Sequence, residues 1–168
     1  MNDSPFKSLD CNSHRIIDSR GYLEILYEQG DAVLKRSFSL AGVFRGMHWQ
    51  RPPYSQTKLI RVRSGRVLDF IVNPTETPAR LYSRELGPSD GWIQIEAHFA
   101  HGFYALENTE FEYLCIGAYN EAAELNFSVL KFLRSSLGLK QLTLSAKDSD
   151  AKTLNVVDGG LHVDFKKL

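Results

Sequence analysis

The sequence predicts an all-β protein of the sandwich, jelly-roll or barrel type. Short apolar runs recur along the chain, and segments that carry Pro, Gly, Asn or Asp separate them; the runs are GYLEILY, RSFSLAGVF, RLYSREL, GWIQIEAHF, HGFYAL and EFEYLCIGAY. Only residues 127–140, FSVLKFLRSSLGLK, place apolar side chains at helical spacing before a glycine. Many short strands with one late helix indicate a β domain with a short C-terminal helical segment.

Two further elements follow from local patterns. Residues 59–72, LIRVRSGRVLDFIV, alternate apolar and polar side chains on both sides of Ser64-Gly65, a dipeptide that favours a tight turn, so we expect a β-hairpin. Residues 156–168, VVDGGLHVDFKKL, predict a terminal hairpin or arm. No repeat, low-complexity tract or linker interrupts the pattern, and we expect one domain over residues 1–168.

Length and composition exclude several classes of protein. The 168 residues are enough for one ordinary core, since a domain of this size buries roughly 70% of the surface of its unfolded chain. Lysine plus arginine and aspartate plus glutamate each total 20, which gives no reason to expect a nucleic-acid or membrane partner. The first ten residues lack an apolar core of signal-peptide length, and no run reaches the ~20 apolar residues of a membrane span. We expect a soluble, cytoplasmic protein.

Strand periodicity gathers polar side chains in the segment TEFEYLCIGAY. Phe111, Tyr113, Cys115 and Tyr119 share one face of the predicted strand. Two phenols on one face could serve a site, but spacing alone leaves open that they simply pack and bond their hydroxyls to water or a carbonyl.

The segment VFRGMHWQ poses a related question. Alternation sends Arg45 and His48 to opposite faces, unless Gly46 permits a bulge that re-aims one of them. A lone histidine in a strand is often only structural, and that interpretation of His48 also stays open. Metal binding is not expected, because His48 lacks a His-x-His partner and His98 and His101 lie three residues apart, on opposite faces of a strand. Cys11 and Cys115 match no metal-site spacing either, and we expect reduced thiols.

Taken together, several motifs resemble a known family. The runs GVFRGMHWQ, PPYSQTKLIRVRSGRVLDFIV, HFAHGF, EYLCIGAYNEAAE and LSAKD are similar, in order and spacing, to the motifs of the dTDP-4-dehydrorhamnose 3,5-epimerase family, from about Asp18 to Asp148. The string R-G-M-H-W-Q followed by P-P, Q-x-K-L, G-x-V-x-D and A-H-G-F is far more specific than any single motif among them. The resemblance implies a cupin-type jelly roll (double-stranded β-helix) that inverts carbons 3 and/or 5 of a nucleotide-linked 4-keto-6-deoxyhexose without metal or organic cofactor.

The resemblance also implies roles for individual residues. His48 would be the base that removes a proton beside the ketone, and Asp148 would orient its imidazole. Lys58 would stabilise the enolate oxygen, and Tyr113 would return a proton from the opposite face. Substrate contacts are implied for Arg20, Arg45, Gln56, His101, Tyr119 and Glu124. Arg61, Arg63 and Arg66 stay ambiguous, because strand residues around a turn are often simply solvated. Homodimers that exchange N-terminal strands are implied as well.

Departures from the family pattern concern the substrate more than the reaction. The expected glutamate after the Asp-x-Arg-Gly start falls at Ile25, one place after Glu24, and a one-residue slip reverses the face of a strand. Other departures are Val33 and Lys35, Asn73 and Thr75, and Glu96-Ala97-His98 before AHGF. A GDP- or UDP-linked sugar, inversion of one carbon, a 3,4-ketoisomerase and a non-catalytic nucleotide-sugar-binding jelly roll are therefore the alternatives. A metal-dependent oxygenase ranks last.

Overall fold

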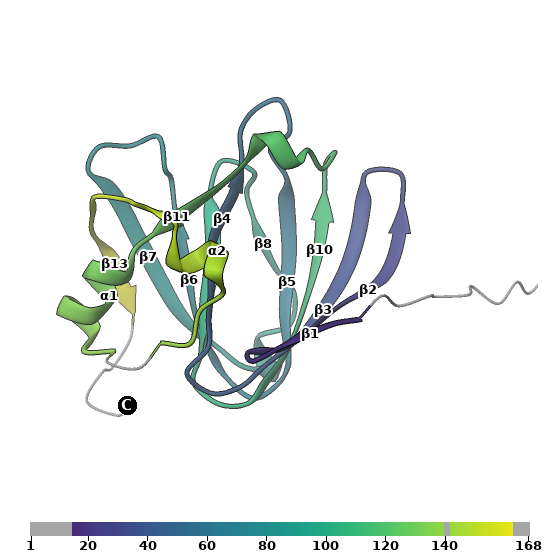
Figure 1. The fold of residues 1–168 in the computed structure, drawn as a ribbon, viewed down its shortest axis with the longest axis horizontal. Coiled ribbons are helices and arrows are strands. Elements are labelled where there is room, and N and C mark those ends of the chain that lie inside the picture. The colour runs from purple at the N-terminus through teal and green to yellow at the C-terminus, as the bar shows by residue number, and fades with distance from the viewer. Residues whose placement is uncertain (1–14, 140–141, 163–168) are drawn as a thin grey trace, which may run out of the picture.

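Two β-sheets pack face to face in the computed structural model, which describes residues 15–139 and 142–162 (Figure 1). The first sheet has six strands in the order β1-β2-β3-β10-β5-β8. Their bounds are β1 Arg15–Asp18, β2 Gly21–Gln29, β3 Ala32–Ser39, β10 Thr109–Ile116, β5 Thr57–Ser64 and β8 Ile93–Ile95.

The second sheet has seven strands in the order β12-β11-β4-β9-β6-β7-β13. Their bounds are β12 Lys152–Thr153, β11 Glu124–Ser128, β4 Phe44–Gln50, β9 Ala100–Ala105, β6 Val67–Val72, β7 Ala79–Leu86 and β13 Val156–His162. Helical segments are short: the 3-10 turns Pro88–Asp90 and Glu121–Ala123, α1 Leu130–Leu137 and α2 Ala146–Ser149. In the described part of the chain, no helix is long and apolar enough to cross a membrane.

Two apolar clusters fix the position of the sheets. Val67 and Phe103 of the second sheet are buried with Ile60, Val62 and Phe111 of the first, so this cluster lies between the sheets. The other cluster joins the outer face of the second sheet to α1, whose buried side chains Leu133 and Leu137 pack with Phe44, Leu68 and Phe70. Because neighbouring strand residues point to opposite faces, Val67 and Leu68 belong to different clusters. Figure 1 shows α1 beside β7 and β13, away from the first sheet.

The predicted hairpin at Ser64-Gly65 is wrong. β5 pairs with β10 and β8, whereas β6 pairs with β7 and β9 in the other sheet. The turn, in which Gly65 has a φ of 76°, therefore carries the chain from one sheet to the other. Val62 and Val67 both point into the core between the sheets, so the alternation correctly indicated burial of one face but not the partner strand.

Other predicted elements differ in extent. The strands predicted at GYLEILY, RLYSREL, HGFYAL and EFEYLCIGAY are confirmed as β2, β7, β9 and β10, while GWIQIEAHF contains only the short β8. RSFSLAGVF is two strands, since β3 ends at Ser39 and the chain turns at Gly42 before β4. The predicted helix is confirmed as α1 but is shorter, because Phe127 and Ser128 belong to β11. The terminal hairpin or arm predicted for residues 156–168 is only partly described: Val156–His162 form β13, a strand parallel to β7, and residues 163–168 lie outside the described residues.

Candidate active site

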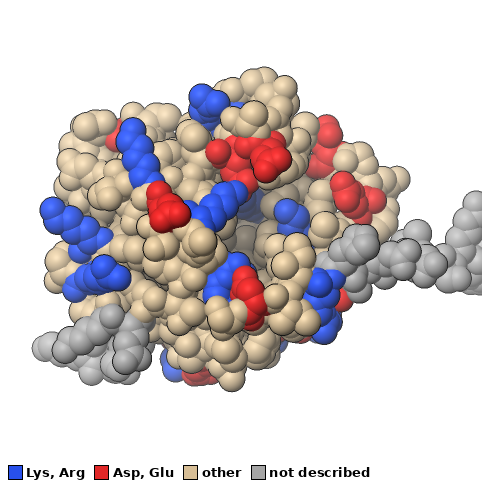
Figure 2. Space-filling view, viewed as in Figure 1, with Lys and Arg blue, Asp and Glu red and all other residues tan. Residues whose placement is uncertain are grey.

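A cavity of about 330 Å³ lies between the two sheets. Its walls include side chains from both sheets and from α2, and Figure 2 shows Lys and Arg side chains gathered around a hollow near the centre of this face. All ten residues that the sequence assigned to the site line the cavity; they are Arg20, Arg45, His48, Gln56, Lys58, His101, Tyr113, Tyr119, Glu124 and Asp148. The fold therefore brings together residues that are spread over most of the chain.

A bulge in β4 aims both Arg45 and His48 into the cavity. Arg45 pairs with Phe103 of β9 and His48 pairs with His101, so three steps along β4 match only two along β9. Gly46 lies in this irregular stretch with a φ of 127°, a conformation that side chains rarely adopt. The sequence predicted that Arg45 and His48 would point to the same side only if the backbone were irregular at Gly46. The structure confirms the irregular backbone and the shared direction of the two side chains.

Replacing Gly46 with alanine is expected to destabilise the protein by about 3 kcal/mol. An alanine Cβ would lie 2.5 Å from the Gly102 Cα and 2.8 Å from the His101 carbonyl oxygen, which are backbone atoms of a central strand, and the φ adds a strain of ~1–3 kcal/mol. Urea unfolding measures the change. Gly42→Ala is the matched control, because Gly42 also has positive φ but has nothing within 4 Å of the added carbon, and we expect a loss of about 1 kcal/mol. Equal losses in the two variants would contradict a close approach at Gly46.

The centre of the site is a histidine–aspartate pair. His48 Nε2 lies 2.7 Å from Asp148 Oδ1, although the residues are 100 positions apart. Asp148 lies on α2, whose first turn is capped by Ser145: the Asp148 N–H donates to Ser145 Oγ at 3.0 Å. The Asp148 side chain is 1% exposed, whereas that of His48 is 38% exposed toward the cavity. Burial by itself would raise the pKa of Asp148, but the hydrogen bond and charge of His48 and the nearby Arg20 lower it. Asp148 is thus held ionised against His48 Nε2, and the His48 side chain remains partly open to the cavity.

Lys58 adds a basic amine beside His48. Its Nζ donates to the His48 carbonyl oxygen at 3.2 Å, and it makes no ion pair within the described residues. Desolvation in the cavity lowers the pKa of Lys58 below its ordinary value. In its protonated form this amine can stabilise negative charge that develops on a bound oxygen, and that charge in turn favours protonation.

The tyrosines lie on the cavity side of β10 and just beyond it, which confirms the face predicted for Phe111, Tyr113, Cys115 and Tyr119. Burial raises the pKa of Tyr113, so its hydroxyl remains protonated and can act as a donor at neutral pH. Tyr119 is 57% exposed. Burial and the bond of its hydroxyl to Glu124 Oε2, 2.8 Å away, raise the pKa of Tyr119 to about 12. Lys147 also donates to Glu124 Oε2 at 2.8 Å, which closes a polar cluster on one side of the cavity.

Arg45 occupies a different part of the cavity. Its guanidinium donates to Ser39 Oγ at 2.9 Å and to the Phe38 carbonyl oxygen at 3.2 Å, both neutral acceptors. Desolvation lowers the pKa of Arg45, which nevertheless stays charged at neutral pH because an arginine starts from 12.5. His101 Nε2 lies 2.7 Å from Asp69 Oδ1 in a buried pair, and Gln56 donates to the Gly117 carbonyl oxygen at 2.7 Å. These bonds fix the orientation of the side chains before any ligand binds.

Lys35 is the lining residue with the clearest functional chemistry that the sequence did not assign to the site. Its Nζ lies 5.9 Å from the ring centroids of both Tyr113 and Tyr119, and it makes no ion pair or hydrogen bond in the described part of the chain. Its even spacing from Ser37 and Ser39 on β3 was the available signal. Arg45 and Lys58 also form no ion pair within the described residues. The cavity therefore carries three basic side chains without a carboxylate partner and favours an anionic ligand.

The ambiguous arginines lie outside the cavity. Arg61 donates to Glu112 at 2.7 Å on the outer face of the first sheet, and Arg66 pairs with Glu85 and Glu107 at the surface. Arg63 also lies on the Glu112 side, 4.0 Å from its carboxylate.

Of the departures from the family pattern, Lys35 lines the cavity, whereas Ile25, Val33, Asn73, Thr75, Glu96, Ala97 and His98 are not among its lining residues. Glu24 is buried and pairs with Arg15, while its neighbour Leu23 lines the cavity. Ala97 offers its carbonyl oxygen to Trp49 Nε1 at 3.1 Å. Among residues 15–139 and 142–162, no group of three or more His, Cys, Asp or Glu side chains is arranged to hold a metal ion.

Comparison with known proteins identifies the family. The family model described as dTDP-4-dehydrorhamnose 3,5-epimerase matches residues 11–156. The chain belongs to this family. Among curated relatives, the dTDP-4-dehydrorhamnose 3,5-epimerase of Mycobacterium tuberculosis (strain ATCC 25618 / H37Rv) is 40% identical over 93 residues, 52% of this chain and 46% of the relative. That of Sinorhizobium fredii is 32% identical over 123 residues, 67% of this chain and 62% of the relative. The chain thus spans about half to three fifths of the length of these epimerases.

Solved epimerases of the family share the fold over more of their length. The dTDP-4-dehydrorhamnose 3,5-epimerase of Sulfolobus tokodaii superposes with a TM-score of 0.63 at 27% identity, and the match covers 83% of this chain and 85% of that one. An epimerase of Legionella pneumophila, solved in complex with dTDP-4-keto-L-rhamnose, superposes with a TM-score of 0.61 at 28% identity, covering 87% of each chain. The predicted all-β, cupin-type jelly roll is therefore confirmed.

Proposed function

We propose that this chain is a sugar-nucleotide epimerase, an isomerase that inverts carbon 3, carbon 5 or both in a nucleotide-linked 4-keto-6-deoxyhexose. The observation that carries the proposal is the convergence of a histidine–aspartate pair, a lysine and a protonated tyrosine on one cavity. Family membership and the substrate named in the Legionella structure, dTDP-4-keto-L-rhamnose, support a dTDP-sugar.

The two walls of the cavity suit a reaction that inverts a carbon. His48 reaches the cavity from β4 in the second sheet, and Tyr113 reaches it from β10 in the first sheet. A sugar between the walls would lose a proton to His48 on one face, and the electrons of the broken C–H bond would form an enolate at the ketone oxygen. Lys58 would stabilise that oxygen, and the Tyr113 hydroxyl would protonate the carbon from the other face. His48, Lys58 and Tyr113 would thus supply the base, the stabilising group and the proton donor that this mechanism needs.

Charge supports a diphosphate in the substrate. Three basic side chains, Lys35, Arg45 and Lys58, line the cavity and have no carboxylate partner among the described residues. The two negative charges of a nucleotide diphosphate and the developing enolate would neutralise them, which offsets the cost of keeping those cations partly desolvated. Arg20, Gln56, His101, Tyr119 and Glu124 would complete the substrate contacts.

We also infer a cytoplasmic homodimer that needs neither metal nor organic cofactor and binds no nucleic acid or membrane. The support for a dimer is β1, the edge strand of the first sheet, whose Ile16 and Ile17 side chains are 66% and 74% exposed. An exposed apolar edge strand is a natural place for pairing with another chain. Sedimentation equilibrium tests this inference: twice the mass of the chain is expected, and the mass of one chain would contradict it.

The deciding experiment follows hydrogen exchange in the substrate. We expect proton NMR in heavy water to show the signals at carbons 3 and 5 of dTDP-4-dehydro-6-deoxyglucose fading in the presence of the protein, because each removed proton is replaced by deuterium. Loss of both signals indicates a double epimerase, and loss of one indicates a single-carbon epimerase or a 3,4-ketoisomerase, which the product distinguishes. A lack of exchange with dTDP-, GDP- and UDP-linked 4-keto sugars alike would overturn the catalytic proposal in favour of a binding protein.

A further inference from the structure

One buried oxygen of the site has no hydrogen-bond partner. Asp148 Oδ1 is bonded to His48, but Oδ2 of the same carboxylate is buried and accepts no hydrogen bond from the described residues. An unsatisfied buried oxygen on an ionised group is costly unless a nearby charge compensates it. The compensating charge must come from a side chain close to Oδ2.

Arg20 is that side chain. Its NH1 lies 3.5 Å from Asp148 Oδ2, beyond a good hydrogen bond but close enough for a strong charge interaction. The rest of the guanidinium is held by Asp18: Nε and NH2 donate to Asp18 Oδ2 at 3.1 and 2.6 Å, and the Arg20 backbone N–H donates to Asp18 Oδ1 at 2.9 Å. Asp18 therefore fixes the plane of the guanidinium and leaves the NH1 edge toward Asp148.

We propose that Arg20 is a positioning residue shared by two carboxylates. The hydrogen bonds from Arg20 to Asp18 fix the distance of the guanidinium from Asp148, and this distance sets how strongly the positive charge of Arg20 acts on the His48–Asp148 pair. Asp18 lies at the end of β1 and is half-exposed, outside the cavity lining, and its hydrogen-bonded link to the pair runs through Arg20. Arg20 is largely buried and lies in the cavity wall. The bond to Arg20 lowers the pKa of Asp18, which keeps Asp18 ionised and able to hold the guanidinium near neutral pH.

The other titratable groups around the pair either form ion pairs with neighbours of their own or keep the same protonation state while the pair titrates. Lys147 is bonded to Glu124, and His101 is paired with Asp69. Burial raises the pKa of Tyr113 and of Cys115, and Tyr119 has a pKa raised to about 12 by burial and its bond to Glu124, so all three stay neutral through the pH range in which the pair titrates. The remaining basic side chains that line the cavity are Lys35, Arg45 and Lys58. The charges of Arg20 and Asp18 act on the pKa of Arg45 in opposite directions, but an arginine that starts from 12.5 stays charged in both variants.

Removal of either partner should therefore move proton binding by the pair in opposite directions. Arg20→Gln removes a cation, which makes each protonation step of the pair easier, and we expect both midpoints to rise by about one pH unit. Asp18→Asn removes an anion and releases the guanidinium toward Asp148 Oδ2, so we expect both midpoints to fall by a few tenths of a unit. Because the two groups are coupled, the midpoints belong to the pair rather than to one residue.

Two measurements test this. Carbon-13 NMR of the ligand-free protein, with the His48 ring and the Asp148 carboxyl labelled, follows the titration without any substrate. The acidic limb of the pH profile of kcat/KM follows the same pair in turnover, and that second readout rests on the proposed epimerase function. If the variants shift the titration midpoints in the NMR measurement but the protein shows no turnover, the positioning role of Arg20 stands and the proposed epimerase function is overturned.

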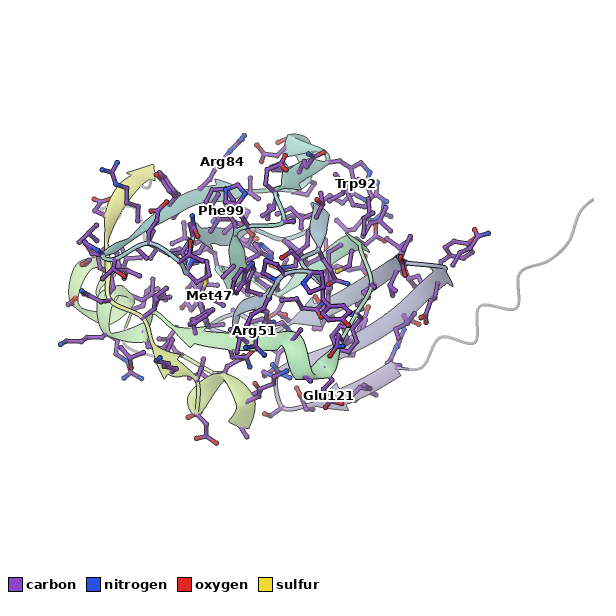
Figure 3. The ribbon with its side chains drawn as sticks, turned by 90° about the horizontal axis from the view of Figure 1, so that it is seen from above. Met47, Arg51, Arg84, Trp92, Phe99 and Glu121 are labelled. Atoms are coloured by element: carbon purple, nitrogen blue, oxygen red, sulfur yellow. The ribbon has the colours of Figure 1, made fainter. Side chains whose placement is uncertain are left out.

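A matched pair of control variants exists on the surface. Arg84 NH2 lies 2.7 Å from Asp90 Oδ1 in an exposed ion pair, and Figure 3 shows Arg84 pointing away from the sheets. Arg84→Gln and Asp90→Asn change net charge by the same amounts and are expected to leave both midpoints in place. The proposal is overturned if Asp18→Asn raises the midpoints or leaves them unchanged, or if the control variants shift them equally. If Arg20→Gln fails to fold, Arg20→Lys takes its place, because lysine retains the charge but cannot make the two side-chain hydrogen bonds to Asp18. A shift of the midpoints in Arg20→Lys that is less than half the shift in Asp18→Asn would also overturn the proposal.

Discussion

His48→Gln is expected to lower kcat for epimerisation by about 10²–10⁴-fold, the contribution typical of a positioned general base. In the structure His48 Nε2 is bonded to Asp148 Oδ1 at 2.7 Å, and a glutamine amide N–H can take the place of Nε2. The variant therefore keeps Asp148 from being left unpaired, but it offers no nitrogen that can accept a proton. The measurement is the steady-state rate of product formation, with solvent exchange at the substrate carbons followed by NMR.

The loss in His48→Gln must be separated from unfolding. The His48 side chain is 38% exposed, so little apolar burial is lost, and we expect the midpoint of thermal unfolding to change by only a few degrees. His98→Gln is the matched control, because His98 is exposed and lies outside the cavity lining. Full turnover by a folded His48→Gln protein would remove His48 from the role of base.

Periodicity predicted where single side chains point, because it reflects which face of a strand is buried. Tyr113 and Cys115 share the cavity face of β10, while Glu112, the residue before Tyr113, pairs with Arg36 and Arg61 on the outer face. The same reasoning identified Gly46 as the position where an irregular backbone could turn Arg45 and His48 to one side. Such predictions need no knowledge of the partner strand.

The spacing of residues along the sequence could not predict which strand pairs with which, or which distant residue a side chain contacts. The hairpin at Ser64-Gly65 was wrong because an alternating pattern fits a turn between two sheets as well as a turn within one. The ion pair of Arg61 depends on the register between β5 and β10, which places Arg61 opposite Glu112. Asp148 lies on a four-residue helix with no periodicity to detect, and only the family motif indicated that it would meet His48.

Tyr113→Phe is expected to separate proton exchange from inversion. Phenylalanine keeps the ring, which packs at 6.1 Å and 50° to Phe111, and it keeps the ring face toward Lys35. Only the hydroxyl is lost, and with it the donor on the first-sheet wall of the cavity. His48 can still remove the proton, exchange it with solvent through its exposed face and return deuterium to the same face of the sugar. We therefore expect deuterium to enter the recovered substrate while formation of inverted product falls by about 10²-fold or more.

This pattern discriminates between donors in a way that a loss of rate alone does not. If water or the Cys115 thiol supplied the second proton, Tyr113→Phe would invert the sugar at close to the normal rate. If the tyrosine only shaped the cavity, exchange and inversion would fall together. Tyr104→Phe serves as the matched control, because Tyr104 packs with the cluster on the α1 side of the second sheet, on the face away from the cavity, and should retain both exchange and inversion. Exchange without inversion would show that base and donor act from opposite walls, which is what an inverting mechanism requires of two sheets that face each other.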